Sequence, residues 1–142
     1  MSGFDTITAI TENLLSLLKS LGLNFVTEID DLAALPASVL PHGQLFYEQA
    51  NFEYAHNQKP EYATAGFKAI VVLALADAHS AIRLQQSWTH LIRDALTVNA
   101  LNVGALAASK LVSLASLDGV ECGTTNNKAF ISFQISIRYR EG

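Results

Sequence analysis

The strongest constraint on the fold of this chain is an apolar segment, Thr64–Ala76, that contains the longest uninterrupted apolar run, Ala69–Ala76. Read as a β-strand, this segment has apolar side chains on both of its faces. A strand of this kind is covered twice, by a helix on one face and by further protein on the other. We therefore expect a layered fold whose second cover comes from the remaining chain or from a neighbouring subunit.

Charged residues are scarce in this chain. Of the 142 residues, 15% are charged and 50% are hydrophobic, whereas ordinary soluble domains carry about 25% charged residues. A chain with so few charged residues has difficulty covering the surface of a monomer, so we expect an oligomer or a permanent partner. We expect no membrane span, because the longest apolar run is far shorter than the roughly 18 residues that a span needs. The N-terminus lacks basic residues, so we also expect no secretory signal.

The charges are divided unevenly along the chain. Residues 1–61 carry eight acids and two bases, and residues 62–142 carry five acids and seven bases. Unlike halves of this kind suit a head-to-tail contact between copies. The C-terminal pair Arg138 and Arg140 is the one local group of basic residues, so we expect no sequence-specific nucleic-acid binding.

Hydrophobic periodicity predicts a first helix over Phe4–Leu21. Apolar residues recur there at steps of three and four, with polar residues between them. Ser2 followed by Asp5 predicts a capping box at the start of the helix, and Gly22 predicts its end. All the periodic apolar residues, Phe4 included, are expected on the buried face.

A second helix is predicted to begin at Asp77 or Ser80 and to end near Val98. Its expected apolar face contains Leu84, Trp88, Leu91, Ile92, Ala95 and Leu96. Strands are expected at Asn24–Ile29, Gln44–Tyr54, Thr64–Ala76, Lys110–Glu121 and Ala129–Tyr139, with a turn at residues 56–60 and loops at residues 30–41 and 99–109. This order predicts one α+β domain over residues 1–142, with a mostly antiparallel sheet, a long hairpin and two main helices packed on it.

No group of residues in the sequence has the spacing of a catalytic, metal or cofactor site. The candidates are His42, His56, His79, His90 and Cys122, and no two of the histidines stand four residues apart. Asp77 and His79 could supply two metal ligands, but a helix cap is the favoured interpretation of Asp77. Cys122 has no nearby base to lower the pKa of its thiol, so we interpret it as a strand residue. We expect no cofactor and no enzymatic activity.

Aromatic residues surround the first predicted hairpin; they are Phe46, Tyr47, Phe52, Tyr54 and Tyr62. Cross-strand packing is the favoured interpretation of this group. An exposed recognition surface is the alternative, and it would place Tyr54 and Tyr62 in an interface.

The arrangement as a whole resembles the tail terminator (tail completion) family of tailed bacteriophages. The matching pieces are the first helix with "SLGLNFVTEID", the connector "LAALPASVL", the strand "FKAIVVLALAD", the helix "SAIRLQQSWTHLIRDAL" and the last strand "AFISFQISIRY". Residues 99–122 lie outside this resemblance. Members of the family are α+β subunits without catalytic residues.

The resemblance implies a virion structural protein, assembled in the host cytoplasm, whose copies form a hexameric ring. That ring would end the tail tube and join tail to head, with the tail tube protein and head–tail connector proteins as partners and its lumen open to passing DNA. The alternative is a small cytoplasmic oligomer, an enzyme or a ligand-binding protein, with a site between subunits.

The uneven charge suggests which residues would meet in such a ring. We expect Arg138 and Arg140 of one subunit to contact Glu28, Asp30 or Asp31 of the next. The equally weighted alternative is that the two arginines only solubilise the C-terminus.

Overall fold

The structure, a computed structural model, describes residues 2–22, 24–26, 35–36, 40–56, 59–74, 78–125 and 127–141. Its elements are α1 (Gly3–Lys19), β1 (Asn24–Val26), β2 (His42–His56), β3 (Lys59–Ala74), α2 (Ala78–Ala95), α3 (Val98–Leu101), the 3₁₀ helix η3 (Gly104–Leu106), β4 (Val112–Thr125) and β5 (Lys128–Arg140). The α+β class, the mostly antiparallel sheet and the long hairpin are thereby confirmed. The sequence predicted all five strands, with ends that differ by a few residues.

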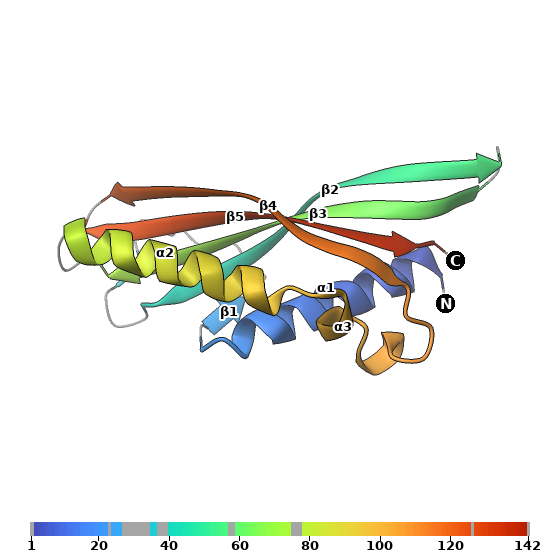
Figure 1. Cartoon of the computed structure of the whole chain (residues 1–142), viewed down its shortest axis with the longest axis horizontal. Coiled ribbons are helices and arrows are strands. Elements are labelled where there is room, and N and C mark those ends of the chain that lie inside the picture. Colours follow the sequence, from blue (N-terminus) through green and yellow to red (C-terminus); the bar gives the residue numbers. More distant parts are fainter. Residues whose placement is uncertain are drawn as a thin grey trace.

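The sheet has the order β1-β2-β3-β5-β4. Its four long strands are antiparallel neighbours, and short β1 runs parallel to the start of β2. Figure 1 shows α1 and α2 on the same side of this sheet, while the β2–β3 hairpin extends beyond the helices at its far end. We call the sheet face that carries the helices the inner face, and the opposite one the outer face.

The core lies between the inner face and the helices. Every second residue of β3 and β5 is buried there, in particular Phe67, Val71, Phe133 and Ile135. α1 contributes Ile10, Leu14 and Leu18, and α2 contributes Ala81 and Ile92. The core is therefore one apolar layer, in which alternate residues of the strands pack against the apolar stripes of the helices.

Within the part of the chain that the structure describes, the outer face of β3 is buried only near one end. Val72 is fully buried there, and its β2 partner His42 is buried. Gln44, the β2 partner of Ile70, is fully buried, whereas Ile70 is half-buried and Ala74 is exposed. The expectation that β3 is covered along both faces thus holds for Val72 and not for the whole strand within one chain. The same expectation included Leu75 and Ala76, and Asp77 was a predicted cap of α2. These three residues lie outside the described residues.

Both predicted signals for the first helix are present. Ser2 and Asp5 form a capping box, and Gly22 adopts φ +94° just after the helix, a backbone conformation that suits glycine. Phe4 departs from the prediction, because its side chain is 76% exposed. Around the helix axis Phe4 is about 120° from the central buried residue Ile10, which places it at the side of the helix and outside the core.

The predicted loop at residues 99–109 contains two short helical turns. α2 ends at Ala95, and Thr97 caps α3 by accepting a hydrogen bond from the Ala100 N–H at 3.1 Å. The Asn13 side chain donates to the carbonyls of Leu101 and Val103, at 2.9 and 3.0 Å. These long-range hydrogen bonds hold the segment against α1, which local sequence patterns did not indicate.

The second helix is less fully buried than its pattern predicted. Trp88 packs against the core and is partly buried, while Leu84 and Leu91 are 39% and 42% exposed. No helix among the described residues is both long enough and apolar enough to cross a membrane.

Candidate interaction surface

The distal end of the β2–β3 hairpin projects from the molecule, and we call its described residues 49–56 and 59–62 the arm (Figure 1). Phe52 and Tyr54 on the arm are exposed, the latter by 61%. Nearer the body, Tyr47 is also exposed, although its ring makes an edge-on contact with the buried Phe67, with centroids 5.5 Å apart. Three of the five aromatic residues that were interpreted as cross-strand packing are therefore largely exposed.

The base of the arm is held by a set of contacts around Arg138, which we call the clasp. On the outer face, the Nε of Arg138 donates to Oε2 of Glu53 at 2.9 Å. Its guanidinium lies over the Tyr62 ring, 3.8 Å from the centroid, and Nη1 is 3.5 Å from Oγ of Ser113. The clasp thus takes one residue from each long strand, and it orients the arm relative to the sheet.

The electrostatics of the clasp follow from this geometry. The hydrogen bond with Glu53 is the main cause that raises the pKa of the Arg138 guanidinium. Both partners are open to solvent, where an ion pair contributes little to stability because water and salt screen it. The clasp is therefore better suited to fixing a direction than to holding the fold together.

A second polar group lies on the outer face beside the clasp. Asp118 stands in a bulge of β4, where it accepts hydrogen bonds from Oγ of Ser116 at 2.7 Å and from Oγ of Ser136 on β5. This carboxylate is engaged by two hydroxyls of its own chain. It ties the edge strand to its neighbour.

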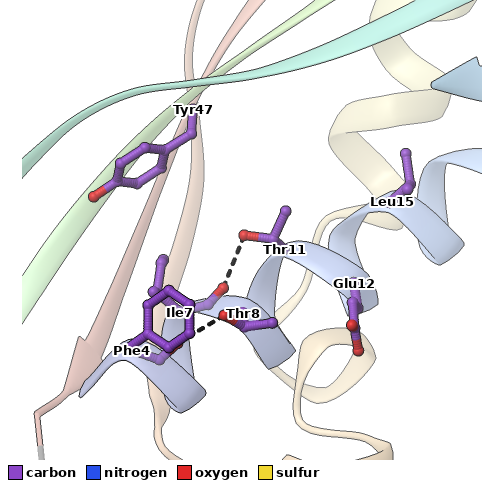
Figure 2. Close-up of a pocket in the computed structure, with 7 residues that line it drawn as sticks. All are labelled: Phe4, Ile7, Thr8, Thr11, Glu12, Leu15 and Tyr47. Carbon is purple, nitrogen blue, oxygen red and sulfur yellow. Dashed lines mark hydrogen bonds between the residues drawn. The ribbon is translucent and has the colours of Figure 1, made fainter. Parts of the chain in front are cut away.

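An open groove of about 570 Å³ runs between α1 and β2 (Figure 2). Its lining consists of Phe4, Ile7, Thr8, Thr11, Glu12 and Leu15 from α1 and Tyr47 from β2. The hydroxyls of Thr8 and Thr11 donate to carbonyls of their own helix, each at 2.8 Å, so they need no outside partner. The groove is thus an apolar surface with Glu12 as its charged residue.

The residues expected at an interface fall into three groups. Tyr62 and Arg138 are in contact in the clasp, and Tyr54 is exposed on the arm. Arg140 is exposed on the same strand as Arg138 and makes no ion pair among the described residues. Glu28, Asp30 and Asp31 lie outside the described residues, so their contact with the arginines stays a prediction.

Sequence reasoning missed Glu53 as the acid that faces Arg138. Eighty-five positions separate the two residues, and only the order of strands brings them together. Reasoning from the sequence also missed the groove. The sequence offered one indication of the groove. Phe4, Thr8 and Leu15 lie at the side of the predicted helix, not at the centre of its apolar stripe.

The histidines and the cysteine were the candidates for chemistry. The described residues contain no group of three or more His, Cys, Asp or Glu side chains that could hold a metal ion. His42 is buried in β2 and His90 is exposed on α2, while the side chains of His56 and His79 lie outside the described residues. Cys122 is exposed on β4, and partial burial raises the pKa of its thiol, which is the opposite of what a nucleophile needs.

Comparison with known proteins adds no family assignment, since no protein-family model and no curated protein matches this chain.

Proposed function

We propose that this chain is a structural subunit of a phage tail terminator. Its copies form a hexameric ring that ends the tail tube and joins tail to head, and the chain has no catalytic role. The observation that carries the proposal is the apolar surface that one copy leaves exposed along the groove and the arm, at Phe4, Tyr47, Phe52 and Tyr54. Exposed apolar surface of this kind marks sites of protein association.

The arm supports contact with the partners of such a ring, the tail tube protein and the head–tail connector proteins. It extends beyond the helices and carries exposed aromatic side chains, which protein interfaces favour. The clasp fixes its direction, so contact with a neighbour costs less ordering than it would for a free loop. DNA passes through the lumen without being read.

The test is assembly of the purified chain. We expect light scattering and native mass spectrometry to report one closed species of six copies, and negative-stain images to show rings. Mixing with the tail tube protein of the same phage should add the ring to tube ends. A chain that stays monomeric over a wide concentration range, or that forms only a compact dimer, contradicts the proposal.

The groove supports the alternative, an oligomeric enzyme or ligand-binding protein with a site between subunits. Its volume of about 570 Å³ lies within the roughly 300–1,000 Å³ of small-molecule sites. A saturable small ligand that quenches Tyr47 fluorescence in a compact dimer would favour this reading. A groove that becomes inaccessible to small apolar probes on ring formation would favour the first.

A further inference from the structure

The two flanks of α1 have different neighbours. On one flank the Asn13 side chain donates to the carbonyls of Leu101 and Val103, which places α3 and the start of η3 against the helix. The opposite flank forms the groove, and Tyr47 is its one lining residue from outside α1. Within the described residues, α1 is therefore packed on one side and open on the other.

The open flank has the spacing of a helix-packing seam. Four of its lining residues follow one another at steps of four, three and four residues, and so lie along one side of α1: Phe4, Thr8, Thr11 and Leu15. The two central side chains are the smaller ones, and their hydroxyls are bonded within the helix. Glu12 is the charged lining residue, and it makes no ion pair with the described residues. The groove therefore suits a compact apolar element that carries a positive charge.

An element of this kind lies on the other flank of the same helix. Residues 103–109, which we call the η3 turn, carry no charged side chain. Leu106 is fully buried and anchors the turn to the core. Five of the seven residues are exposed and are apolar or glycine: Val103, Gly104, Ala105, Ala107 and Ala108. Lys110 follows directly, is exposed and makes no ion pair with the described residues.

The η3 turn is held in one conformation from both ends. Before it, the Asn102 side chain bonds to the backbone N–H and C=O of Val112, at 3.0 and 2.9 Å. Within it, the Leu106 N–H donates to the Val103 carbonyl at 3.1 Å, and the Lys110 N–H donates to the Leu106 carbonyl at 2.9 Å. An element that is already ordered loses little conformational entropy when it binds. The turn lies beyond α1 on the side away from the sheet, where a neighbouring molecule can reach it (Figure 1).

We propose that the η3 turn of one copy docks in the groove of the next copy, with Lys110 close to Glu12. This inference rests on the proposed function, because it names a contact that joins neighbouring subunits of the ring. Each α1 is then packed on both flanks, by its own η3 turn and by that of a neighbour. The groove and the turn are different surfaces, so the contact is heterologous and repeats around an axis until it closes.

Charge selects the η3 turn over the arm, which is the other projecting apolar element. The described part of the arm carries two acids, Glu53 and Glu61, against one base, Lys59. Its net charge has the same sign as Glu12, whereas Lys110 beside the η3 turn has the opposite sign. An exposed ion pair adds little affinity, but unlike charges fix the register of a contact and like charges disfavour the wrong one.

The first experiment mixes two single-cysteine variants before assembly, each in a Cys122→Ser background. Thr8→Cys places a thiol in the groove and Ala105→Cys places one on the η3 turn, and both positions are exposed. After treatment with a short bismaleimide, we expect a denaturing gel to show covalent dimers in the mixture and in neither variant alone, because each contact offers one thiol of each kind. A matched control mixes Thr8→Cys with Gln134→Cys, which is exposed on the outer face and should give no dimers.

The second experiment reverses the charges. Glu12→Lys and Lys110→Glu each place like charges at the contact, so each should raise the concentration needed for assembly several-fold at low salt. The double variant restores opposite charges and should assemble close to the parent concentration. Both positions are exposed, and circular dichroism checks that each variant is folded.

Every outcome bears on the inference. Covalent dimers from one single-cysteine variant alone show a two-fold contact and overturn it. Rings that give no dimers in the mixture, or a double charge variant that assembles as poorly as the single ones, also overturn the inference and leave the proposed function standing. A parent chain that never assembles overturns the proposed function, and the inference falls with it.

Discussion

The two faces of the antiparallel sheet are built from the same strands and behave differently. On the inner face of β3 and β5, residues such as Phe67 and Phe133 are fully buried under the helices. One position further along each strand, on the outer face, Lys68 is half-buried and Gln134 is exposed. Burial of a large apolar side chain contributes roughly 1.5–3 kcal/mol, and an exposed ion pair about 0–1 kcal/mol. Stability therefore resides mainly on the inner face, and the outer face away from Val72, His42 and Gln44 is free to serve contact and orientation.

The largest expected effect comes from placing a charge on the inner face. Val71→Asp or Leu73→Asp should abolish soluble expression, because an unpaired carboxylate there costs several kcal/mol, on the order of 3–5. Both positions are buried in the core layer. Soluble yield and circular dichroism measure the outcome.

The matched change on the outer face is Gln134→Asp, whose cross-strand neighbour is Lys68. We expect its stability to lie within about 0.5 kcal/mol of the parent. Ser132→Asp and Ser136→Asp should both cost more, since each places a second carboxylate beside an acid of β4, Glu121 in the first case and Asp118 in the second. If the inner and outer variants behave alike, the assignment of faces is wrong.

Two residues of α1 sharpen the comparison within one helix. Leu14→Ala, at a fully buried position, should lower the free energy of unfolding by about 2–5 kcal/mol. Phe4→Ala, in the groove, should change it by less than about 0.5 kcal/mol and instead weaken assembly. Chemical denaturation of the monomer and light scattering separate the two effects, and a large loss of stability in Phe4→Ala would contradict the exposed position.

An alkaline titration tests the polar group of the inner face. Burial, helped by the charge of Glu141, raises the pKa of Tyr139 to about 12, against about 10 in the unfolded chain. The unfolded chain therefore loses this proton first. The neutral Tyr139 side chain therefore makes its full contribution to stability below pH 10, and this contribution is lost as the pH rises towards 12.

The loss through Tyr139 amounts to roughly 1.4 kcal/mol for each unit by which its pKa is raised. Tyrosinate absorbance measures the ionisation of Tyr139, and denaturation curves at each pH measure the loss of stability. Tyr139→Phe should flatten the alkaline decline, and an unchanged decline in that variant would show that another group causes it.

The smallest expected effect concerns the arginines of the outer face. Arg140→Glu should weaken assembly at low salt and less so at high salt, because exposed charges are screened. Arg138→Glu also breaks the clasp, so Glu53→Gln serves as the control that disturbs the clasp and leaves both arginines charged. If the double variant Arg138→Glu, Arg140→Glu gives the parent oligomer at every salt concentration, the electrostatic contact is wrong.

The spacing of apolar residues and the composition of the chain were enough to predict most of the fold. Alternation in Ala129–Tyr139 and the three- and four-residue steps of the first helix are local properties, and the structure confirms both elements. The capping box of Ser2 and Asp5 is equally local. The prediction was incomplete where distant backbone decides the conformation, as at α3, which Asn13 holds from another helix.

The candidate site could be predicted only in part. Tyr62 and Arg138 were both singled out, but nothing in the sequence says that they touch each other, or that Glu53 rather than another acid faces the guanidinium. Strand order and register determine such pairs, and a shift of one residue in β5 would turn Arg138 to the inner face.

The sequence by itself determined which residues are apolar, how they repeat, and therefore which elements form and which face of each seeks burial. Only the tertiary structure decided which apolar side chains remain uncovered. Phe4 and Tyr47 satisfy the patterns of a helix and a strand, yet they line a groove, because the described part of one chain places nothing over them. Burial depends on the positions of all neighbouring elements at once, and that information exists only after they have packed.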